Sequence, residues 1–270
     1  MKTKKRILVG IDYTKSSENA LHYALMLAKK TNASVTLLHV FEFPLIHTNS
    51  GLYVVDYKAV KERDLHKLEH VKTNALKKFP KATIECINTT DTVKGFIKDL
   101  AKKKKIDYVI LGLETKNKIS KFIYGTTSID LASKIDCPII IVPEAYKKHQ
   151  LIHASITVDN KESIKKRIIK KALDFTHAHK CDHQLIHIKT EDEFLMVYEK
   201  NTAKENKKWH VKTFEAKDFN TGVNTYAKGH KTDLIILFSH SHSIFYNFFS
   251  ETNTKHIAFG SKIPVMSIHE

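Results

Sequence analysis

Two positions in the first half of the chain carry residue types that could bind a phosphorylated ligand. Asp12 directly follows the apolar run 7–11, and Gly112 directly follows a second apolar run, 107–111. The segment that Gly112 opens continues to Gly125, where a helix with free N–H groups is expected to begin. Such a helix start attracts phosphate, and glycine lets the backbone approach it closely. These residues could form an anion site, but by themselves they favour the alternative, a long connection whose glycines only form turns.

Other sequence signatures of phosphate chemistry and catalysis are missing. The chain has no Walker motif and no G-x-G-x-x-G fingerprint, so it is neither a P-loop NTPase nor a dinucleotide-binding Rossmann protein. No Ser/His/Asp or Cys/His arrangement suggests a catalytic centre. We therefore expect no dedicated enzyme, and weak ATP hydrolysis is left open.

Histidines gather at several places, and each group is interpreted as structural or solvated. The segment 177–183 contains His177, His179, Cys181 and His183. Their alternating spacing would suit a metal ion only in an extended chain, and the matching stretch 29–35 of the first half reads as an ordinary turn. We interpret 177–183 as a solvated turn. His240 and His242 are not expected to bind metal either, and His39 and His187 are expected to be structural.

The chain contains the same pattern twice. Asp107-Tyr-Val-Ile-Leu-Gly112 matches Asp233-Leu-Ile-Ile-Leu-Phe238 at an offset of 126 positions (233 − 107). Phe238 thus faces Gly112, and Glu251 faces Gly125, where a carboxylate would repel a nucleotide. The second copy therefore lacks the candidate site. The aromatic residues 245–249 of its loop are interpreted as filling a vestigial cavity, with a hydrophobic docking surface as the alternative.

Short apolar runs alternate with helical patterns in both copies, which predicts parallel βαβ units in an α/β fold. In the first copy, strands are expected at 7–11, 34–40, 83–87, 107–111 and 138–142. Ser16 and Ser17 are expected to cap the first helix, and a loop with Pro44 and Gly51 is expected after the second strand. The next helix should place Leu65, Leu68, Val71, Ala75, Leu76 and Phe79 on one side. The predicted domains are 1–144 and 151–270, joined by a polar linker, and the second is shortened in its middle.

Composition restricts the location and the partners. The 270 residues carry a formal net charge of +16, but lysines occur in nearly every expected helix rather than along one stripe. We therefore expect a solvated basic surface and no nucleic-acid partner. No run approaches the ~18 apolar residues of a membrane span, and no signal peptide is apparent. The three scattered cysteines favour a reducing compartment, so a cytoplasmic protein is expected.

The chain resembles the universal stress protein family over essentially its whole length, as two tandem domains. The matching pieces are Ile7-Leu-Val-Gly-Ile-Asp12 with Ser17-x-x-Ala20, then Leu37-Leu-His-Val40, and the segment 112–143. The family's nucleotide motif is G-x-x-G, nine residues, then G-[S/T]. Here Gly112-Leu-Glu-Thr115 is followed by nine residues and then by Gly125-Thr126.

The resemblance implies two doubly wound domains, each with a five-stranded parallel sheet of order 3-2-1-4-5, and a site that binds ATP in some members. In those members the aspartate after strand one and the main chain ending strand two hold the adenosine, and the glycine loop holds ribose and phosphates. The corresponding positions here are Asp12, Val40, Gly112, Thr115, Gly125, Thr126 and Thr127. We therefore expect ATP or another adenine nucleotide, and no metal beyond the Mg²⁺ that accompanies it.

Thr115 replaces the second glycine of the motif. A β-branched residue is disfavoured where φ is positive, although its hydroxyl can donate to a phosphate oxygen. The expected function is a stress or regulatory protein whose state depends on a nucleotide. The alternatives are a nucleotide-independent interaction module of the same fold and, less favoured, a weak ATPase.

The expected partner is the chain itself. The two copies should pair through their fifth strands, 138–142 and 264–268, because an exposed apolar edge is a liability that pairing removes. A homodimer is left open, and the protein partner is unknown.

Overall fold

The computed structural model describes residues 4–41, 45–48, 51–54, 56–103, 105–113, 135, 137–148, 150–158, 166–190, 210–239 and 262–269. Strands and helices alternate along both halves of the chain. The first half contains β1 (Arg6–Gly10), α1 (Lys15–Thr31), β2 (Ser34–Val40), β3 (Leu45–Thr48), β4 (Gly51–Val54), α2 (Tyr57–Lys78), β5 (Thr83–Thr89), α3 (Val93–Lys102), β6 (Tyr108–Leu113) and β7 (Ile139–Pro143). The second contains β8 (His153–Thr157), α5 (Lys166–Ala178), β9 (Asp182–Thr190), β10 (Val211–Ala216), α7 (Phe219–Gly229), β11 (Leu234–Ser239) and β12 (Val265–His269).

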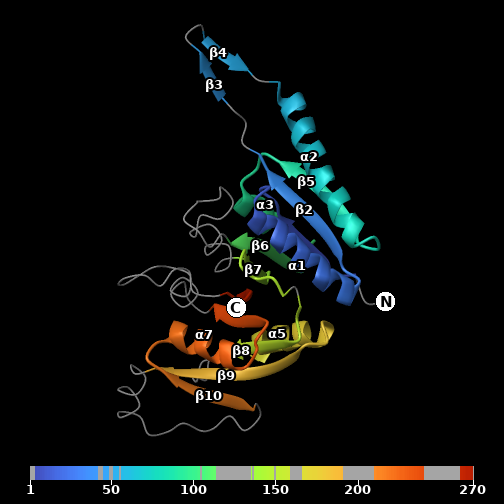
Figure 1. Ribbon diagram of the computed structural model, residues 1–270. Helices are drawn as coiled ribbons and strands as arrows, with labels where there is room; N and C mark the ends of the chain where they lie inside the picture. Colours follow the sequence, from blue (N-terminus) through green and yellow to red (C-terminus); the bar gives the residue numbers. More distant parts are fainter. Residues whose placement is uncertain are drawn as a thin grey trace.

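Ten strands form one continuous sheet, in the order β10-β9-β8-β11-β12-β7-β6-β1-β2-β5 (Figure 1). Within each half of this ten-stranded sheet, all neighbouring strands are parallel. Numbered by half, both halves have the order 3-2-1-4-5, which confirms the predicted α/β topology. In each half the strand order reverses between the first and fourth strands, at β1 and β6 and again at β8 and β11.

The two halves join through their fifth strands. β7 and β12 pair antiparallel, with Ile140 opposite Met266 and Ile141 opposite Val265. All four side chains are at most 2% exposed. The predicted pairing is therefore confirmed, and it turns two apolar edges into the centre of a sheet.

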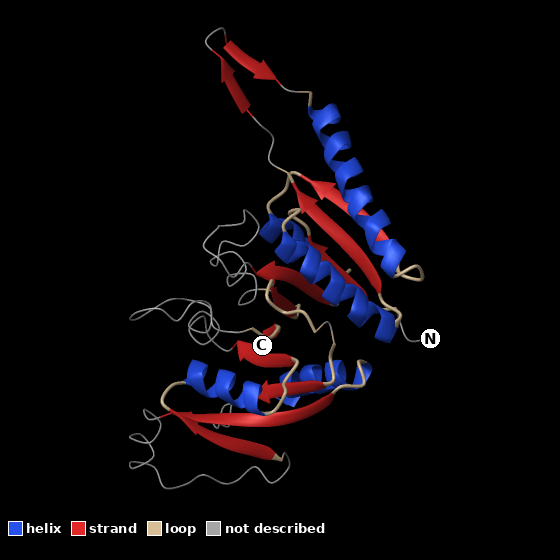
Figure 2. Cartoon of the chain, in the orientation of Figure 1, coloured by secondary structure: helices blue, strands red, loops and turns tan. Residues whose placement is uncertain are grey.

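Helices cover both faces of the sheet (Figure 2). One hydrophobic core contains residues of α1, α2 and α5, and it runs without interruption from the first half into the second. The other core contains residues of α3 and α7 on the opposite face. The halves consequently share their interior as well as their strands.

Helix α1 begins one turn earlier than its serines suggested. Thr14 is extended, with φ −82° and ψ 161°, and its side chain accepts a hydrogen bond from the Ser17 N–H. The prediction that Ser16 and Ser17 cap this helix is wrong, since both lie buried inside its first turn. Ser17 Oγ instead accepts a hydrogen bond from the Asp12 N–H at 3.4 Å.

The segment expected to be a loop after β2 contains an antiparallel hairpin. β3 and β4 pair from Leu45 with Val54 to Thr48 with Gly51, and two residues separate the strands. A two-residue connection is the length that hairpins favour. Figure 1 shows the hairpin projecting beyond the large sheet, next to the start of α2.

The predicted apolar side of helix α2 faces the core except near the start of the helix. Leu68 is fully buried, and Val71, Ala75, Leu76 and Phe79 pack against the core. Leu65 was expected on the apolar side, but it is 37% exposed. The buried positions of the first turns are Val60, Asp64 and Leu68, which follow each other at i, i+4 spacing. A carboxylate thus occupies the position that the sequence pattern assigned to leucine.

The polar segment that links the halves is packed against α1. The Asn19 side-chain amide donates to the carbonyl oxygens of Pro143 at 2.9 Å and Tyr146 at 3.0 Å. The Tyr146 hydroxyl donates to the Gln150 carbonyl at 2.9 Å, and its ring is 4% exposed. These bonds hold the linking segment on α1, together with the Tyr146 N–H, which donates to the Pro143 carbonyl at 3.0 Å.

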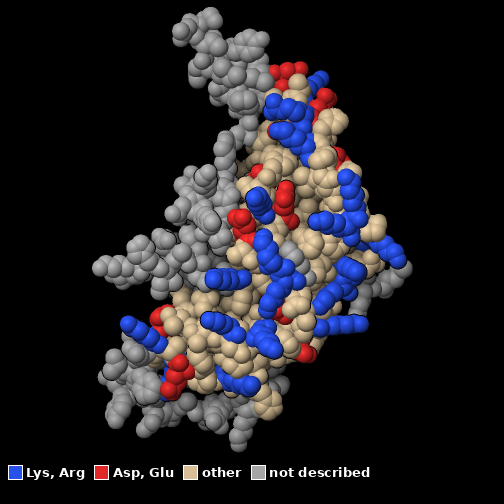
Figure 3. All heavy atoms as spheres, viewed as in Figure 1, with Lys and Arg blue, Asp and Glu red and all other residues tan. Residues whose placement is uncertain are grey.

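Basic side chains are dispersed over the surface. Figure 3 shows lysine and arginine along α2 and across the second half, with acidic side chains between them. This agrees with the expected spread of charge. None of the described helices has the length and apolar character needed to cross a membrane.

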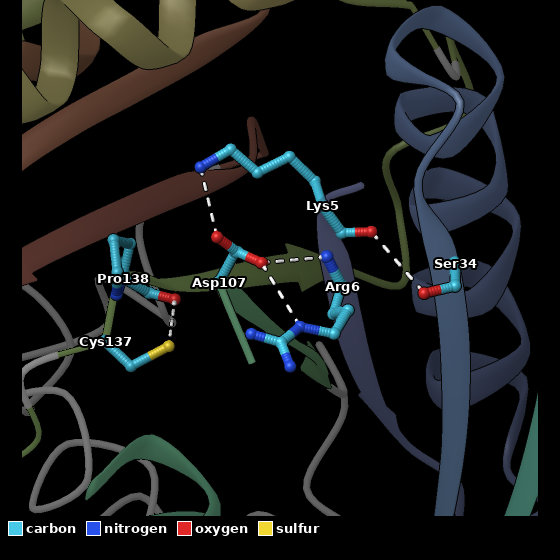
Figure 4. Close-up of polar contacts among 6 residues, drawn as sticks. All are labelled: Lys5, Arg6, Ser34, Asp107, Cys137 and Pro138. Atoms are coloured by element: carbon cyan, nitrogen blue, oxygen red, sulfur yellow. Dashed lines mark hydrogen bonds and ion pairs between the residues drawn. The ribbon is translucent and has the colours of Figure 1, made fainter. Parts of the chain in front are cut away.

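The repeat is visible in matching polar contacts. Asp107, just before β6, accepts from the Arg6 N–H at 2.9 Å and forms an ion pair with Lys5 at 3.0 Å (Figure 4). The equivalent Asp233, just before β11, accepts from the His153 N–H at 3.2 Å. Each carboxylate ties the start of the fourth strand of its half to the start of the first strand.

Candidate functional site

Three of the predicted site residues meet at one edge of the first half-sheet. Asp12 follows β1, Val40 ends β2, and Gly112 lies next to the end of β6. Because these strands are parallel neighbours, their carboxyl ends face the same way. The edge lies where the strand order reverses, which is where ligands bind in open α/β sheets. Thr115, Gly125, Thr126 and Thr127, together with the helix expected to start at Thr126, lie outside the described residues.

The two oxygens of the Asp12 carboxylate differ in their hydrogen bonds. Oδ1 accepts hydrogen bonds from the Thr14 N–H at 3.0 Å and from the Thr14 hydroxyl at 2.5 Å. Oδ2 is buried and has no hydrogen-bond partner among the residues that the structure describes. A buried carboxylate oxygen without a donor is costly, and a bound ligand that donates to it would remove that cost.

Tyr13 also lies at this edge, although it was not among the predicted site residues. Its φ is 63°, in the left-handed region that a bulky side chain rarely adopts. The ring lies 4.6 Å from the His39 ring, and the hydroxyl donates to the Asp64 carbonyl at 3.2 Å. Burial raises the pKa of Tyr13, and the nearby Asp64 charge raises it further. One sequence signal existed: Asn160 stands after Asp159 in the second copy, and asparagine tolerates positive φ.

His39 of β2 and His187 of β9 have the structural role expected of them. His39 Nδ1 is 2.7 Å from the Ile11 carbonyl oxygen, and His187 Nδ1 is 3.1 Å from the Val158 carbonyl oxygen. Each ring thereby ties the second strand of its half to the residue just after the first strand.

Val40, the last residue of β2, lies on the other side of this edge. Its side chain packs against the core on the α3 face, and its Cα is paired with that of Thr89. The following N–H, of Phe41, donates to the Thr89 carbonyl at 3.0 Å. β2 and β5 therefore stay paired to the end of β2, which fixes the backbone at this edge.

Gly112 is required by the packing of α1 on β6. A Cβ at this position would lie 2.3 Å from the carbonyl carbon and oxygen of Ser16 and 2.8 Å from the Ser17 nitrogen. The first turn of α1 therefore touches β6 backbone to backbone. The sequence pattern suggested that this glycine lets a phosphate approach, whereas the described contact is with the protein's own helix α1.

Phe238 occupies the same register position in the second half. It is 5% exposed and belongs to the core that contains α1 and α5. Its side chain thus fills space on the helix side of β11, on the face where the first half holds the start of α1. The second half cannot reproduce the close approach seen at Gly112.

The histidine-rich segment 177–183 is not a solvated turn throughout. His179 is fully buried and Cys181 is 5% exposed, so the prediction of a solvated turn is wrong at these positions. Burial lowers the pKa of His179 to about 4, and burial raises the pKa of Cys181 to about 12. Among the described residues, no group of three or more His, Cys, Asp or Glu is arranged to hold a metal ion.

The burial of His179 comes from the joint between the halves. Its ring stacks on Phe175 of α5 with centroids 4.3 Å apart, and Tyr108 of β6 lies 6.1 Å away. Lys30, at the end of α1, donates to the carbonyl oxygens of Leu151 at 2.6 Å and His179 at 3.3 Å. Residues of the first half therefore close over this segment of the second.

The cysteines do not have the environment of a nucleophile. Burial, followed by the charge of Glu69, raises the pKa of Cys86 to about 12. A thiol with a raised pKa is poorly reactive at neutral pH. Cys137 is buried, with Sγ 3.8 Å from the Pro138 carbonyl oxygen (Figure 4).

Known proteins share both this sequence pattern and this fold. The model of the universal stress protein family matches residues 4–143. Universal stress protein YxiE of Bacillus subtilis is 29% identical over 146 residues, which cover 51% of this chain and 97% of that protein. The family match lies in the half that contains Asp12 and Gly112.

Solved structures extend the likeness to the full length. A universal stress protein from Archaeoglobus fulgidus superposes with a TM-score of 0.62 at 14% identity and covers 98% of both chains. A putative universal stress protein from Pseudomonas aeruginosa gives 0.54 at 12% identity, covering 99% of this chain and 94% of the other. These two show the shared fold, and the family match over more than half of the chain shows the descent: the protein belongs to the universal stress protein family.

Proposed function

We propose that the first half of this protein binds an adenine nucleotide at the carboxyl ends of β1, β2 and β6. The observation that carries the proposal is the buried Asp12 Oδ2, which has no donor in the described part of the chain and lies at the reversal of strand order. An adenosine offers both amino and hydroxyl donors that could satisfy such an oxygen. The Val40 main chain would complete the adenosine side.

The phosphates would be held by the loop from Gly112 and by the expected helix start. Thr115, Gly125, Thr126 and Thr127 are proposed for this role because their spacing matches the family's nucleotide motif. If a nucleotide brings Mg²⁺, the metal would interact with its phosphates rather than with a site of its own.

The second domain, 151–270, is proposed to lack nucleotide and to serve as scaffold for the first, 1–144. Phe238 replaces the glycine, and Glu251 places a carboxylate where Gly125 stands. Both changes oppose a bound phosphate, one by volume and one by charge. The whole protein would be a stress-response or regulatory protein whose state depends on one nucleotide and which carries no dedicated catalysis.

Isothermal titration with ATP, ADP and AMP tests the proposal. Asp12→Ala should weaken binding by about 1–3 kcal/mol, the usual cost of losing a charged hydrogen-bond partner, and Gly125→Glu should abolish it. Asp99→Ala, at an exposed ion pair with Lys103 on α3, is the matched control and should bind as wild type does. Equal affinity in wild type and both site variants would place the ligand elsewhere.

Two further measurements separate the alternatives. Acid release and chromatography of the purified protein would identify any nucleotide that copurifies. Steady phosphate release from ATP would indicate an ATPase. Wild type that binds no adenine nucleotide at millimolar concentration would support the interaction module instead.

A further inference from the structure

The turn that presents Asp12 is connected to helix α2 by a single aromatic side chain. Tyr13 follows Asp12 in sequence, and its hydroxyl donates to the Asp64 carbonyl in the middle of α2, at 3.2 Å. The Lys67 ammonium group, one turn further along α2, lies 5.9 Å from the centre of the Tyr13 ring. The same residue therefore belongs to the candidate site and contacts a distant helix.

The backbone of Tyr13 is strained. Its φ of 63° places a bulky L-residue in the left-handed region, at a cost of about 1–2 kcal/mol. Such a conformation persists only where surrounding contacts impose it, and these outliers cluster at ligand sites and switches. Here the imposing contacts are the tilted ring contact with His39 and the hydroxyl bond to α2.

The strain and the incomplete carboxylate are adjacent. Asp12 Oδ1 is bonded to Thr14 on the far side of Tyr13, so the conformation of residue 13 sets the direction in which the carboxylate points. Oδ2 is left buried without a donor. A ligand that bonds to Oδ2 would favour the turn in its present form, and with it the contact to α2.

The part of α2 that Tyr13 touches is less embedded in the core than the rest. Leu68 is fully buried in the core with Val71 and Ala75 beside it, whereas most residues from 58 to 67 are exposed. This half of α2 also adjoins the β3–β4 hairpin, which projects past the sheet (Figure 1). Its stability is therefore sensitive to one additional tertiary bond.

The connection that contains α2 is longer than its counterpart in the second half. The offset between the halves falls from 148 at the second strand (187 − 39) to 126 at the fourth, so the second half has 22 fewer residues between these strands. The element that Tyr13 contacts thus lies in the longer connection, in the half with the candidate site.

We propose that Tyr13 is a positioning residue that couples occupancy of the Asp12 site to helix α2, so that a bound nucleotide stabilises the first turns of α2 and the hairpin before them. The inference rests on the proposed function. Coupling between sites is reciprocal, and each contact to α2 also strengthens binding at Asp12. The signal of nucleotide binding would accordingly be read out at α2 and the hairpin.

Hydrogen exchange with and without ATP tests this coupling in the full-length protein. In wild type, ATP should slow exchange of the backbone amides of residues 58–67. Tyr13→Phe keeps the ring on His39 but removes the bond to Asp64, so ATP should no longer slow these amides. By reciprocity its ATP affinity should fall by about fivefold or more.

Tyr146→Phe is the matched control. It also removes a hydroxyl bond to a backbone carbonyl, that of Gln150 at 2.9 Å, but this bond lies within the segment that links the halves and does not involve α2. Its thermal stability should fall, while ATP affinity and the protection of α2 should stay as in wild type. Tyr13→Asn, which accepts a positive φ and keeps neither contact, should reproduce the loss of coupling if Tyr13→Phe does not fold.

The outcomes distinguish the two proposals. If Tyr13→Phe loses stability as Tyr146→Phe does, yet binds ATP and protects α2 normally, Tyr13 is only structural and the coupling is wrong. If wild type binds ATP without any change at α2, the coupling is likewise wrong and the nucleotide site stands. If wild type binds no adenine nucleotide, both proposals fall together.

Discussion

Replacing Gly112 by alanine should destabilise the protein and disturb the Asp12 site at the same time. The new Cβ would lie 2.3 Å from the Ser16 carbonyl group, where an ordinary contact is 3.4–4 Å. Relief requires α1 and β6 to separate by about 1 Å, and both are buried elements of a close-packed core. Overpacking of this kind costs about 1–3 kcal/mol, and we expect the upper part of that range because backbone atoms must move.

The displacement also reaches the site. The Asp12 N–H donates to Ser17 Oγ in the same turn of α1, so a shifted turn moves the Asp12 backbone. Urea denaturation followed by circular dichroism measures the stability, and isothermal titration measures nucleotide affinity. Gly229→Ala is the control, because a Cβ there meets nothing within 4 Å. It should be neutral or stabilise by up to ~1 kcal/mol. The packing argument is refuted if Gly112→Ala unfolds at the same urea concentration as Gly229→Ala.

Two further predictions concern buried polar residues of the second half. Asp233 is 1% exposed and accepts from the Ile152 and His153 N–H groups at 3.0 and 3.2 Å, so Asp233→Asn should cost about 1.5–3 kcal/mol in urea denaturation. Asp107→Asn, at the equivalent and more exposed position, should cost less, and an equal or larger loss there would contradict this ranking. The buried His179, with its pKa lowered to about 4, stays neutral in the folded protein while an unfolded chain takes up a proton below about 6.5. Stability should therefore fall as the pH drops from 6.5 towards 4, by up to about 3 kcal/mol from this group. His179→Gln should flatten that decline and His66→Gln, on the exposed side of α2, should not. Parallel pH profiles for wild type and His179→Gln would sink the idea.

Topology was predictable because it depends on patterns that neighbouring residues carry. Short apolar runs alternating with helical periodicity require parallel crossovers, and the internal repeat requires that both halves obey the same order. The fifth-strand joint followed from the apolar edges of 138–142 and 264–268. Strand boundaries shifted by one or two residues, as at β6, which runs from Tyr108 to Leu113 rather than from 107 to 111.

Features imposed by tertiary contacts were not predictable in the same way. His179 and Cys181 are buried because Lys30 and Tyr108 of the other half cover them, and nothing near position 179 in sequence carries that information. The left-handed backbone of Tyr13 is likewise imposed by His39 and α2. Periodicity placed Leu65 on the buried side of α2, but the buried residue there is Asp64, whose carbonyl accepts the bond from Tyr13. Of the candidate site, the sequence pattern placed Asp12 and Gly112 at the ends of neighbouring strands, as the structure does, but it did not indicate that Gly112 packs against α1.

The two halves differ in a manner that separates scaffold from site. Contacts that join strands are present in both: the aspartate before the fourth strand, and the histidine that reaches across from the second strand to the residue after the first. The backbone contact at the candidate edge differs between the described parts of the two halves: Gly112 admits the start of α1, and Phe238 is its counterpart. A continuous core and a shared antiparallel strand pair mean that the second half can stabilise the first whether or not it binds anything. A half without the candidate site can therefore still contribute to the fold.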